Sequence, residues 1–311
     1  MVASCISFVS LYGSFLRRSI TASGLCPQSV DVDAYTTIHY WGPKPQPAST
    51  VSPASNGDHR KPSLVLIHGF GPHGVWQWRQ QVSFLAPYFD VYVPDLVFFG
   101  ESTTKSSERS EIFQASAVGK MMEKVGVSKY SVVGTSYGGF VAYRMAEMWP
   151  ERVEKVVIAS SGVNMRPRDN QELIKRANVK KIDELMLPET AGQLRSLFRL
   201  AVINHVYMPD FFLNDFIDKL YCENRKEKLE LLKGLVLGQH ETPNISPLQQ
   251  EVLIIWGDQD NIFLSDMAKE LKEMLGKNAS LEVIKKAAHV PQLEQAKTFN
   301  KILYNFLCDS S

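Results

Sequence analysis

The sequence reads Tyr-Ser-Val-Val-Gly-Thr-Ser-Tyr-Gly-Gly over residues 130–139, between an apolar run and a helical pattern that continues from Phe140 to Trp149. A Gly-x-Ser-x-Gly pentapeptide in this place is typical of a sharp strand-to-helix turn, because small residues on both sides of the serine allow a turn too tight for larger side chains. Such a turn lifts the serine hydroxyl above the edge of a sheet. We therefore take Ser136 as a candidate nucleophile and compare the rest of the chain with that hypothesis.

Apolar runs and helical patterns alternate along most of the chain. The unbroken run from Ser63 to Ile67 is typical of a strand buried on both faces in a parallel sheet. Similar runs lie at 91–93, 132–133, 156–159, 252–256 and, more weakly, 281–284, and helical patterns lie at 76–85, 111–125, 140–149, 265–275 and 293–307. A short antiparallel pair, residues 30–32 and 36–41, is expected first, followed by an exposed proline-rich loop at 42–62. The pattern predicts an α/β fold with a mostly parallel, doubly wound sheet.

The alternation breaks once, between Val163 and about Pro247, where no strand-like run occurs. Helical patterns at 183–187, 190–202, 209–221 and 226–237 fill this segment. We predict that residues 163–247 form a helical cap, inserted into an α/β core of residues 30–162 and 248–311. The cap's Phe198, Phe211, Phe212 and Leu213 suggest an apolar substrate pocket beneath it.

Residues 1–29 form a separate N-terminal segment with Arg17, Arg18 and no acidic residue before Asp31. Its apolar part is too short to span a bilayer. We expect an amphipathic helix that lies on the protein or binds weakly to a membrane, and an organellar transit peptide is the alternative. The expected location is cytoplasmic, with an organellar or peripheral-membrane location as alternatives.

Composition and charge indicate no large polyanionic partner. The chain has 34 basic and 33 acidic residues and a net charge of +1, so bulk electrostatics do not favour nucleic acid. Its four cysteines are far apart and lack the spacing of metal ligands. We therefore expect neither a metal nor a cofactor, and we expect a small-molecule ester as the partner.

A second glycine-rich turn, His68-Gly69-Phe70-Gly71, follows the first long apolar run. Acyl transfer needs preorganised donors for an oxyanion, and the predicted donors are the N–H groups of Phe70 and Tyr137. His68 is expected to brace this loop. Residues 69–74 also fit the dinucleotide-binding pattern G-x-G-x-x-G, but Pro72 removes a backbone donor where a pyrophosphate would bind.

A serine needs a base to take its proton and an acid to orient that base. His289 follows the last strand pattern, where a loop at the carboxyl edge would bring it over Ser136. The acid should follow the preceding strand, and both Asp258 and Asp260 qualify by type.

Four motifs carry a family resemblance: His-Gly-Phe-Gly at 68–71, Gly-Thr-Ser-Tyr-Gly-Gly at 134–139, Trp-Gly-Asp-Gln-Asp at 256–260 and Ala-His-Val-Pro-Gln-Leu-Glu at 288–294. With them the chain resembles capped serine esterases and lipases of the α/β-hydrolase superfamily over residues 30–308. It is similar to plant hydrolases of that superfamily and, more distantly, to monoacylglycerol lipases. The resemblance implies that Asp260, the fourth position of G-x-x-D, is the acid. Residues 98–102, Phe-Phe-Gly-Glu-Ser, depart from the D-x-x-G-x-G-x-S of many relatives.

A serine at the turn, where epoxide hydrolases and dehalogenases of the superfamily have aspartate, favours an acyl-enzyme and a carboxylic ester substrate. We expect Gly69, Trp76 and Phe212 to contact that substrate, with an apolar acyl or alcohol group. The alternatives are a small-molecule receptor of the same fold that hydrolyses slowly or not at all, and a lyase or acyltransferase with the same triad.

Overall fold

The computed structural model describes residues 7–45 and 61–309, so most of the loop expected at 42–62 lies outside the described residues. The strands are β1 (Leu25–Asp31), β2 (Thr36–Pro43), β3 (Ser63–Ile67), β4 (Asp90–Pro94), β5 (Thr103–Thr104), β6 (Tyr130–Thr135), β7 (Val153–Ala159), β8 (Glu251–Gly257) and β9 (Ala279–Ile284). The helices are α1 (Phe8–Ala22), α2 (Gly74–Leu85), α3 (Glu111–Lys124), α4 (Tyr137–Met148), α5 (Pro167–Ala177), α6 (Ile182–Met186), α7 (Ala191–Ala201), α8 (Asp210–Leu220), α9 (Arg225–Lys233), α10 (Ser265–Leu275), α11 (Pro291–Glu294) and α12 (Ala296–Cys308).

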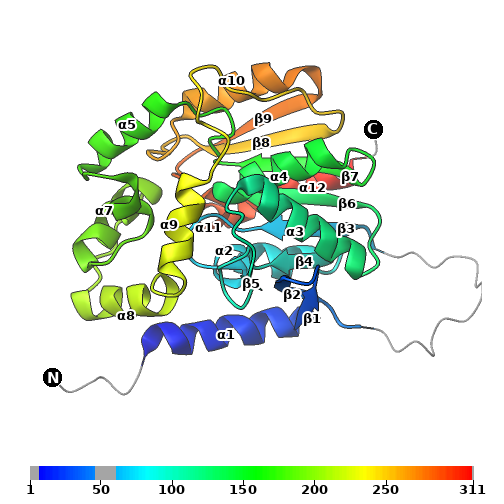
Figure 1. The fold of residues 1–311 in the computed structure, drawn as a ribbon, viewed down its shortest axis with the longest axis horizontal. Helices are drawn as coiled ribbons and strands as arrows, with labels where there is room; N and C mark the ends of the chain where they lie inside the picture. The colour runs from blue at the N-terminus through cyan, green and yellow to red at the C-terminus, as the bar shows by residue number, and fades with distance from the viewer. Residues whose placement is uncertain (1–6, 46–60, 310–311) are drawn as a thin grey trace, which may run out of the picture.

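The strands form one mixed sheet in the order β1-β2-β4-β3-β6-β7-β8-β9, with β5 paired to β2 (Figure 1). All neighbours from β4 to β9 pair in parallel, whereas β2 pairs antiparallel with β1, β4 and β5. The predicted mostly parallel, doubly wound α/β sheet is confirmed.

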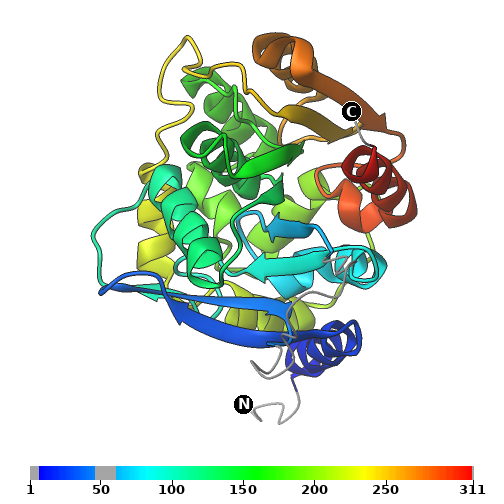
Figure 2. The same cartoon turned by 90° about the vertical axis from the view of Figure 1, so that its right-hand side faces the viewer.

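Two apolar cores lie on opposite faces of the sheet, because alternate residues of each strand point to opposite sides. In β3, Val65 and Ile67 join the core beneath α3, α4 and α10, whereas Leu64 and Leu66 join the core beneath α1, α2 and α12. Figure 2 shows these two groups of helices on opposite sides of the sheet. Burial on both faces explains the unbroken apolar runs.

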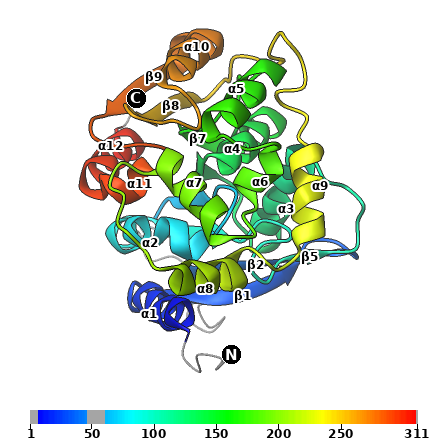
Figure 3. The ribbon, with the colours of Figure 1, turned by 90° about the vertical axis from the view of Figure 1, so that its left-hand side faces the viewer.

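Helices α5 to α9 all lie between β7 and β8 in the chain. Figure 1 shows them gathered at one end of the sheet, and Figure 3 looks onto that end. The sequence patterns did not predict α5, because it is mostly polar and buries only Leu173 and Ala177. The single helix expected at 293–307 is instead α11 and α12, separated by the non-helical Gln295.

The N-terminal helix α1 packs against α2, α8 and β1. Strand β1 begins at Leu25, opposite Pro43 of β2, and ends at Asp31, so the strand expected at 30–32 starts five residues earlier than predicted. The reason is that pairing with β2 extends the strand through Cys26, Pro27 and Gln28, which carry no apolar alternation. No helix in the described part of the chain is both long enough and apolar enough to cross a membrane.

Candidate active site

Ser136 occupies a strained turn between β6 and α4. Its φ of 52° lies in the left-handed region, which non-glycine residues rarely adopt without support from their surroundings. A Cβ atom at Gly134 would lie 2.0 Å from the carbonyl oxygen of Gly138, and one at Gly138 would lie 2.3 Å from that of Ile67. The two glycines are therefore required for a turn this tight, and the turn exposes the serine hydroxyl at the carboxyl edge.

Ser136, His289 and Asp260 form a hydrogen-bonded chain. His289 Nε2 lies 2.9 Å from Ser136 Oγ, and His289 Nδ1 lies 3.0 Å from Asp260 Oδ2. Because a carboxylate can only accept, Nδ1 carries the proton and Nε2 is left to accept from the serine hydroxyl. Asp258 is not part of this chain: its Oδ1 accepts from the Ala287 N–H at 3.4 Å. Of the two acids left open by the spacing, the structure places Asp260 on the histidine.

The loop after β8 determines which oxygen of Asp260 faces the histidine. Its Oδ1 accepts from the N–H groups of Ile262 at 2.8 Å and Phe263 at 3.0 Å. The carboxyl group is therefore held by two backbone donors, and Oδ2 is left for His289. Asp260 is only 3 % exposed, so little water competes for these bonds.

Two backbone N–H groups beside Ser136 have no acceptor within residues 7–45 and 61–309. They belong to Phe70 and Tyr137, the predicted oxyanion donors. Tyr137 is the first residue of α4, where an N–H has no intrahelical partner. The neighbouring Gly69 N–H, in contrast, donates to Gln77 Oε1 at 2.8 Å. This arrangement could bind an oxyanion above the serine.

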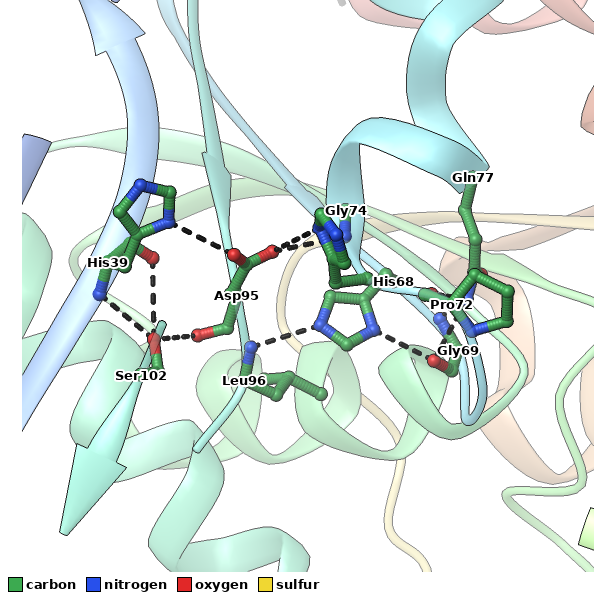
Figure 4. Close-up of polar contacts among 10 residues, drawn as sticks. His39, His68, Gly69, Pro72, Gly74, Gln77, Asp95, Leu96 and Ser102 are labelled. Atoms are coloured by element: carbon green, nitrogen blue, oxygen red, sulfur yellow. Dashed lines mark hydrogen bonds and ion pairs between the residues drawn. The ribbon is translucent and has the colours of Figure 1, made fainter. Parts of the chain in front are cut away.

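Gln77 holds the loop that carries Phe70. Besides accepting from Gly69, its Nε2 donates to the carbonyl oxygens of Gly69 and Pro72 (Figure 4). This residue was not predicted from the sequence. The available signal was a glutamine one turn into the helix after the glycine-rich loop, where its amide can reach back to the loop backbone.

Asp95, directly after β4, also holds this loop in place. Its Oδ1 accepts from the Gly74 N–H at 3.1 Å and lies 3.4 Å from His73 Nδ1, and its Oδ2 lies 3.0 Å from His39 Nδ1 (Figure 4). Burial acts to raise the pKa of Asp95, but the two histidines outweigh it and hold that pKa below its usual range. The Gly74 N–H that a pyrophosphate would need in a dinucleotide site is therefore already bound to a carboxylate.

His68 braces the loop, as predicted. Its Nδ1 lies 2.8 Å from the carbonyl oxygen of Gly69, and its Nε2 accepts from the Leu96 N–H at 3.0 Å (Figure 4). A backbone N–H can only donate, so the imidazole must be neutral with its proton on Nδ1. Burial lowers the pKa of His68 to about 4.

Because folded His68 is neutral, we predict that the free energy of unfolding decreases in mild acid. In the unfolded chain His68 would take up a proton near pH 6.5, whereas in the folded protein it resists protonation down to about pH 4. Its stabilisation is therefore complete above pH 6.5 and decreases as the pH falls towards 4, by about 3 kcal/mol in total. His39, whose pKa is raised by Asp95 despite burial, acts in the opposite direction.

Urea denaturation at pH 7, 5.5 and 4.5 measures this effect. We expect the free energy of unfolding to depend less on pH in a His68→Asn variant, even if that variant is less stable at pH 7. If the free energy of unfolding changed equally with pH in the native protein and the variant, the neutral state of folded His68 would be contradicted.

A cavity of about 340 Å³ opens above Ser136, between the sheet and the cap. The three predicted substrate-contact residues, Gly69, Trp76 and Phe212, all line it. Two of the four apolar cap residues singled out in the sequence do not: Phe211 is 64 % exposed, and Leu213 is fully buried elsewhere. The reason is that successive positions on a helix point in different directions, so a cluster in sequence does not share one face.

Other lining residues were missed. Val9 and Tyr12 of α1 and Phe216 of α8 contribute apolar surface, and Arg79 is a charged residue at the wall. Nothing local marks a residue near position 10 as part of a site built around residue 136, because only long-range packing of α1 on the cap brings them together.

Glu294 joins the histidine loop to the cap. Its Oε2 accepts from the Ala288 N–H and its Oε1 from the Ile203 N–H, both at 2.7 Å. The His289 N–H also donates to the cap, to the carbonyl oxygen of Ala201 at 3.1 Å. The position of the histidine therefore depends on the position of the cap.

Known proteins with similar sequences identify the family. A family model for the alpha/beta hydrolase fold matches residues 62–296. The 2-hydroxy-6-oxo-6-phenylhexa-2,4-dienoate hydrolase of Burkholderia cepacia is 25% identical over 265 residues, 79% of this chain and 88% of that protein. The 2-hydroxy-6-oxononadienedioate/2-hydroxy-6-oxononatrienedioate hydrolase of Escherichia coli K12 is 24% identical over 79% of this chain and 86% of its own.

Solved structures are similar over almost the whole chain. A putative lipase from Acinetobacter baumannii AYE matches with a TM-score of 0.77 and 23% identity, covering 95% of each chain. A carboxylesterase from Bacillus subtilis matches with a TM-score of 0.66 and 19% identity, covering 96% of this chain and 99% of its own. The similarity to these solved structures shows the fold. The two relatives compared by sequence are named as hydrolases. The family model covers most of the chain. The chain belongs to the alpha/beta hydrolase fold family.

Proposed function

We propose that the protein is a serine hydrolase that cleaves carboxylic esters through an acyl-enzyme on Ser136. The observation that carries this proposal is the hydrogen-bonded chain from Asp260 through His289 to Ser136, which opens into an apolar cavity. Beside it lie the N–H groups of Phe70 and Tyr137, which have no acceptor among the described residues. The relatives are hydrolases, which supports the general reaction class.

Each step of the proposed reaction uses a group already in place. His289 Nε2 takes the proton of Ser136 as Oγ attacks the ester carbonyl, and the Phe70 and Tyr137 N–H groups bind the resulting oxyanion. The imidazolium, stabilised by Asp260, then gives that proton to the leaving alcohol. Water attacks the acyl-enzyme with His289 again as the base, which releases the acid and regenerates the serine.

The cavity favours an apolar acyl or alcohol group. Phe216 lies edge-on to Trp76 and Phe198, with ring centroids 5.9 Å and 5.8 Å apart, and these three rings form one wall. Aromatic walls of this kind bind hydrocarbon by excluding water. Fatty acyl esters such as monoacylglycerols are therefore the substrate class that we propose.

A chain-length series of p-nitrophenyl esters tests this proposal. We expect kcat/KM to rise at least tenfold from the acetate to the octanoate, since each buried methylene contributes about 0.8 kcal/mol. A Phe216→Ala variant should lose most of that increase and much less of the acetate rate. Rates that fall steadily beyond the acetate would contradict the apolar substrate.

A second reaction, hydrolysis of a carbon–carbon bond, is suggested by the named activities of the relatives. Such a substrate carries a carboxylate, and Arg79 on the cavity wall is a group that could bind it. Turnover of the phenylhexadienoate of the Burkholderia relative, faster than that of any ester, would favour this alternative. If each protein molecule cleaved only one substrate molecule, slowly, whichever substrate was offered, a small-molecule receptor of the same fold would be favoured instead.

A further inference from the structure

Helix α1 presents an apolar face to solvent as well as to the protein. Val9, Gly13, Leu16 and Ile20 are buried on its inner side. Phe8, Leu11, Tyr12 and Phe15 are 51 %, 59 %, 44 % and 61 % exposed, at the spacing that places them on one side of a helix. The ring of Phe211 on α8, also exposed, lies 6.4 Å from that of Phe8. We call these five side chains the α1–α8 apolar surface.

This surface is continuous with the rim of the substrate cavity. Tyr12 belongs to both: it lines the cavity, and its ring lies edge-on to Trp76 with centroids 5.4 Å apart. The first turn of α1 is fixed to the cap because Asp215 Oδ2 accepts from Ser7 Oγ at 2.9 Å and from the Val9 N–H at 3.0 Å. Figures 1 and 3 both show α1 alongside α8. A flat partner on this surface would therefore contact the cavity rim.

The charged side chains beside the α1–α8 apolar surface that have no ion-pair partner among the described residues are positive. Arg17 and Arg18 are exposed near the end of α1, and neither has an ion-pair partner in the part of the chain that the structure describes. The acidic residues on α8 are engaged: Asp210 pairs with Arg195, Asp218 with Lys219, and Asp215 holds the start of α1. Arg18 lies three residues beyond Phe15 and so extends the same side of the helix.

We propose that the α1–α8 apolar surface docks on a lipid bilayer that contains anionic lipid, and that an ester substrate passes from the bilayer past Tyr12 into the cavity. An amphipathic helix with aromatic residues on one side and arginines beside them binds at the bilayer interface through apolar burial and attraction to anionic headgroups. The docking explains why large apolar side chains remain exposed next to a cavity suited to hydrocarbon. The second part of the inference rests on the proposed ester hydrolysis, and the docking itself does not.

Cosedimentation of the full chain with vesicles tests the docking. We expect binding to phosphatidylcholine vesicles that contain phosphatidylglycerol, weaker binding to phosphatidylcholine alone, and release as salt is raised. A Leu11→Gln/Phe15→Gln variant, altered outside the cavity, should bind at least tenfold more weakly and keep its rate on a soluble short-chain ester. Its rate on an ester incorporated in the vesicles should fall. An Arg17→Gln/Arg18→Gln variant should lose the preference for anionic lipid.

The matched control is Tyr35→Gln, because Tyr35 is 65 % exposed in the turn between β1 and β2, outside the defined surface. It should bind vesicles like the native chain. No vesicle binding by the native chain, or equal binding by the Leu11/Phe15 variant, would overturn the proposal. So would a native dimer that this variant dissociates, because the surface would then be a contact between two copies.

The docking and the hydrolysis can fail separately. Ser136→Ala protein should bind vesicles as tightly as the native chain, since the binding assay needs no catalysis. Vesicle binding without turnover of any ester would remove the proposed function and leave the docking. Ester turnover without vesicle binding would remove the docking proposal and leave the proposed function.

Discussion

Replacing Ser136 with alanine should abolish ester turnover, with kcat falling by about 10⁶-fold. The hydroxyl is the only part of the side chain that faces His289, and alanine keeps the Cβ atom that the turn already accommodates. The variant should therefore fold normally, with an unchanged melting temperature. Labelling by a fluorophosphonate probe, which requires an activated serine, should be lost together with turnover.

Ser160 provides a matched control for this experiment. It directly follows the neighbouring strand β7, is fully buried, and has a φ of 43°, close to the 52° of Ser136. Its hydroxyl has no hydrogen-bond partner among the described residues, so no base activates it. Ser160→Ala should keep both labelling and turnover. Absence of labelling in the folded native protein would remove the catalytic proposal and favour a binding protein.

Replacing Asp260 with asparagine should lower kcat by about 10⁴-fold without unfolding the protein. The Ile262 and Phe263 N–H groups need an acceptor, so the amide oxygen must take the place of Oδ1. The amide nitrogen then faces His289 Nδ1 and donates to it. This forces the imidazole proton onto Nε2, which can no longer accept the proton of Ser136.

The neighbouring Asp258 gives a control of the same type and loop. Among the described residues, its carboxylate contacts only the Ala287 N–H and, at 3.9 Å, Lys285 Nζ. Asp258→Asn keeps an acceptor for that N–H, and kcat should stay within about threefold of the native value. If the Asp258 variant lost more activity than the Asp260 variant, the assignment of the acid would be wrong. Steady-state rates on one p-nitrophenyl ester compare the two.

The link through Glu294 gives the cap a direct influence on the chemistry. Its two oxygens connect Ala288, next to His289, with Ile203, two residues beyond the end of α7. A displacement of α7 would therefore move the histidine relative to Ser136, where a change of 1 Å can cost about 100-fold in rate.

Local chemistry made the framework of this protein predictable from the amino-acid sequence alone. The run from Ser63 to Ile67 matches β3 residue for residue, and the pentapeptide at 134–138 joins β6 to α4 as its small residues require. The types of residue in the site, a serine after one strand, an aspartate after another and a histidine after the last, could also be read in order. Each of these features depends on residues within a few positions of one another, so the local sequence pattern is enough to predict it.

Only the tertiary structure decided which of these groups meet and what surrounds them. It placed on His289 the Asp260 that the family resemblance implies and that spacing alone left open beside Asp258, and it brought α1 to the cavity with Val9 and Tyr12. The first residues of β1 follow the same rule, because pairing with β2 forms them where the local pattern is weak. Side chains converge through contacts between segments distant in the chain, and a spacing in sequence carries no information about the direction in which each one points.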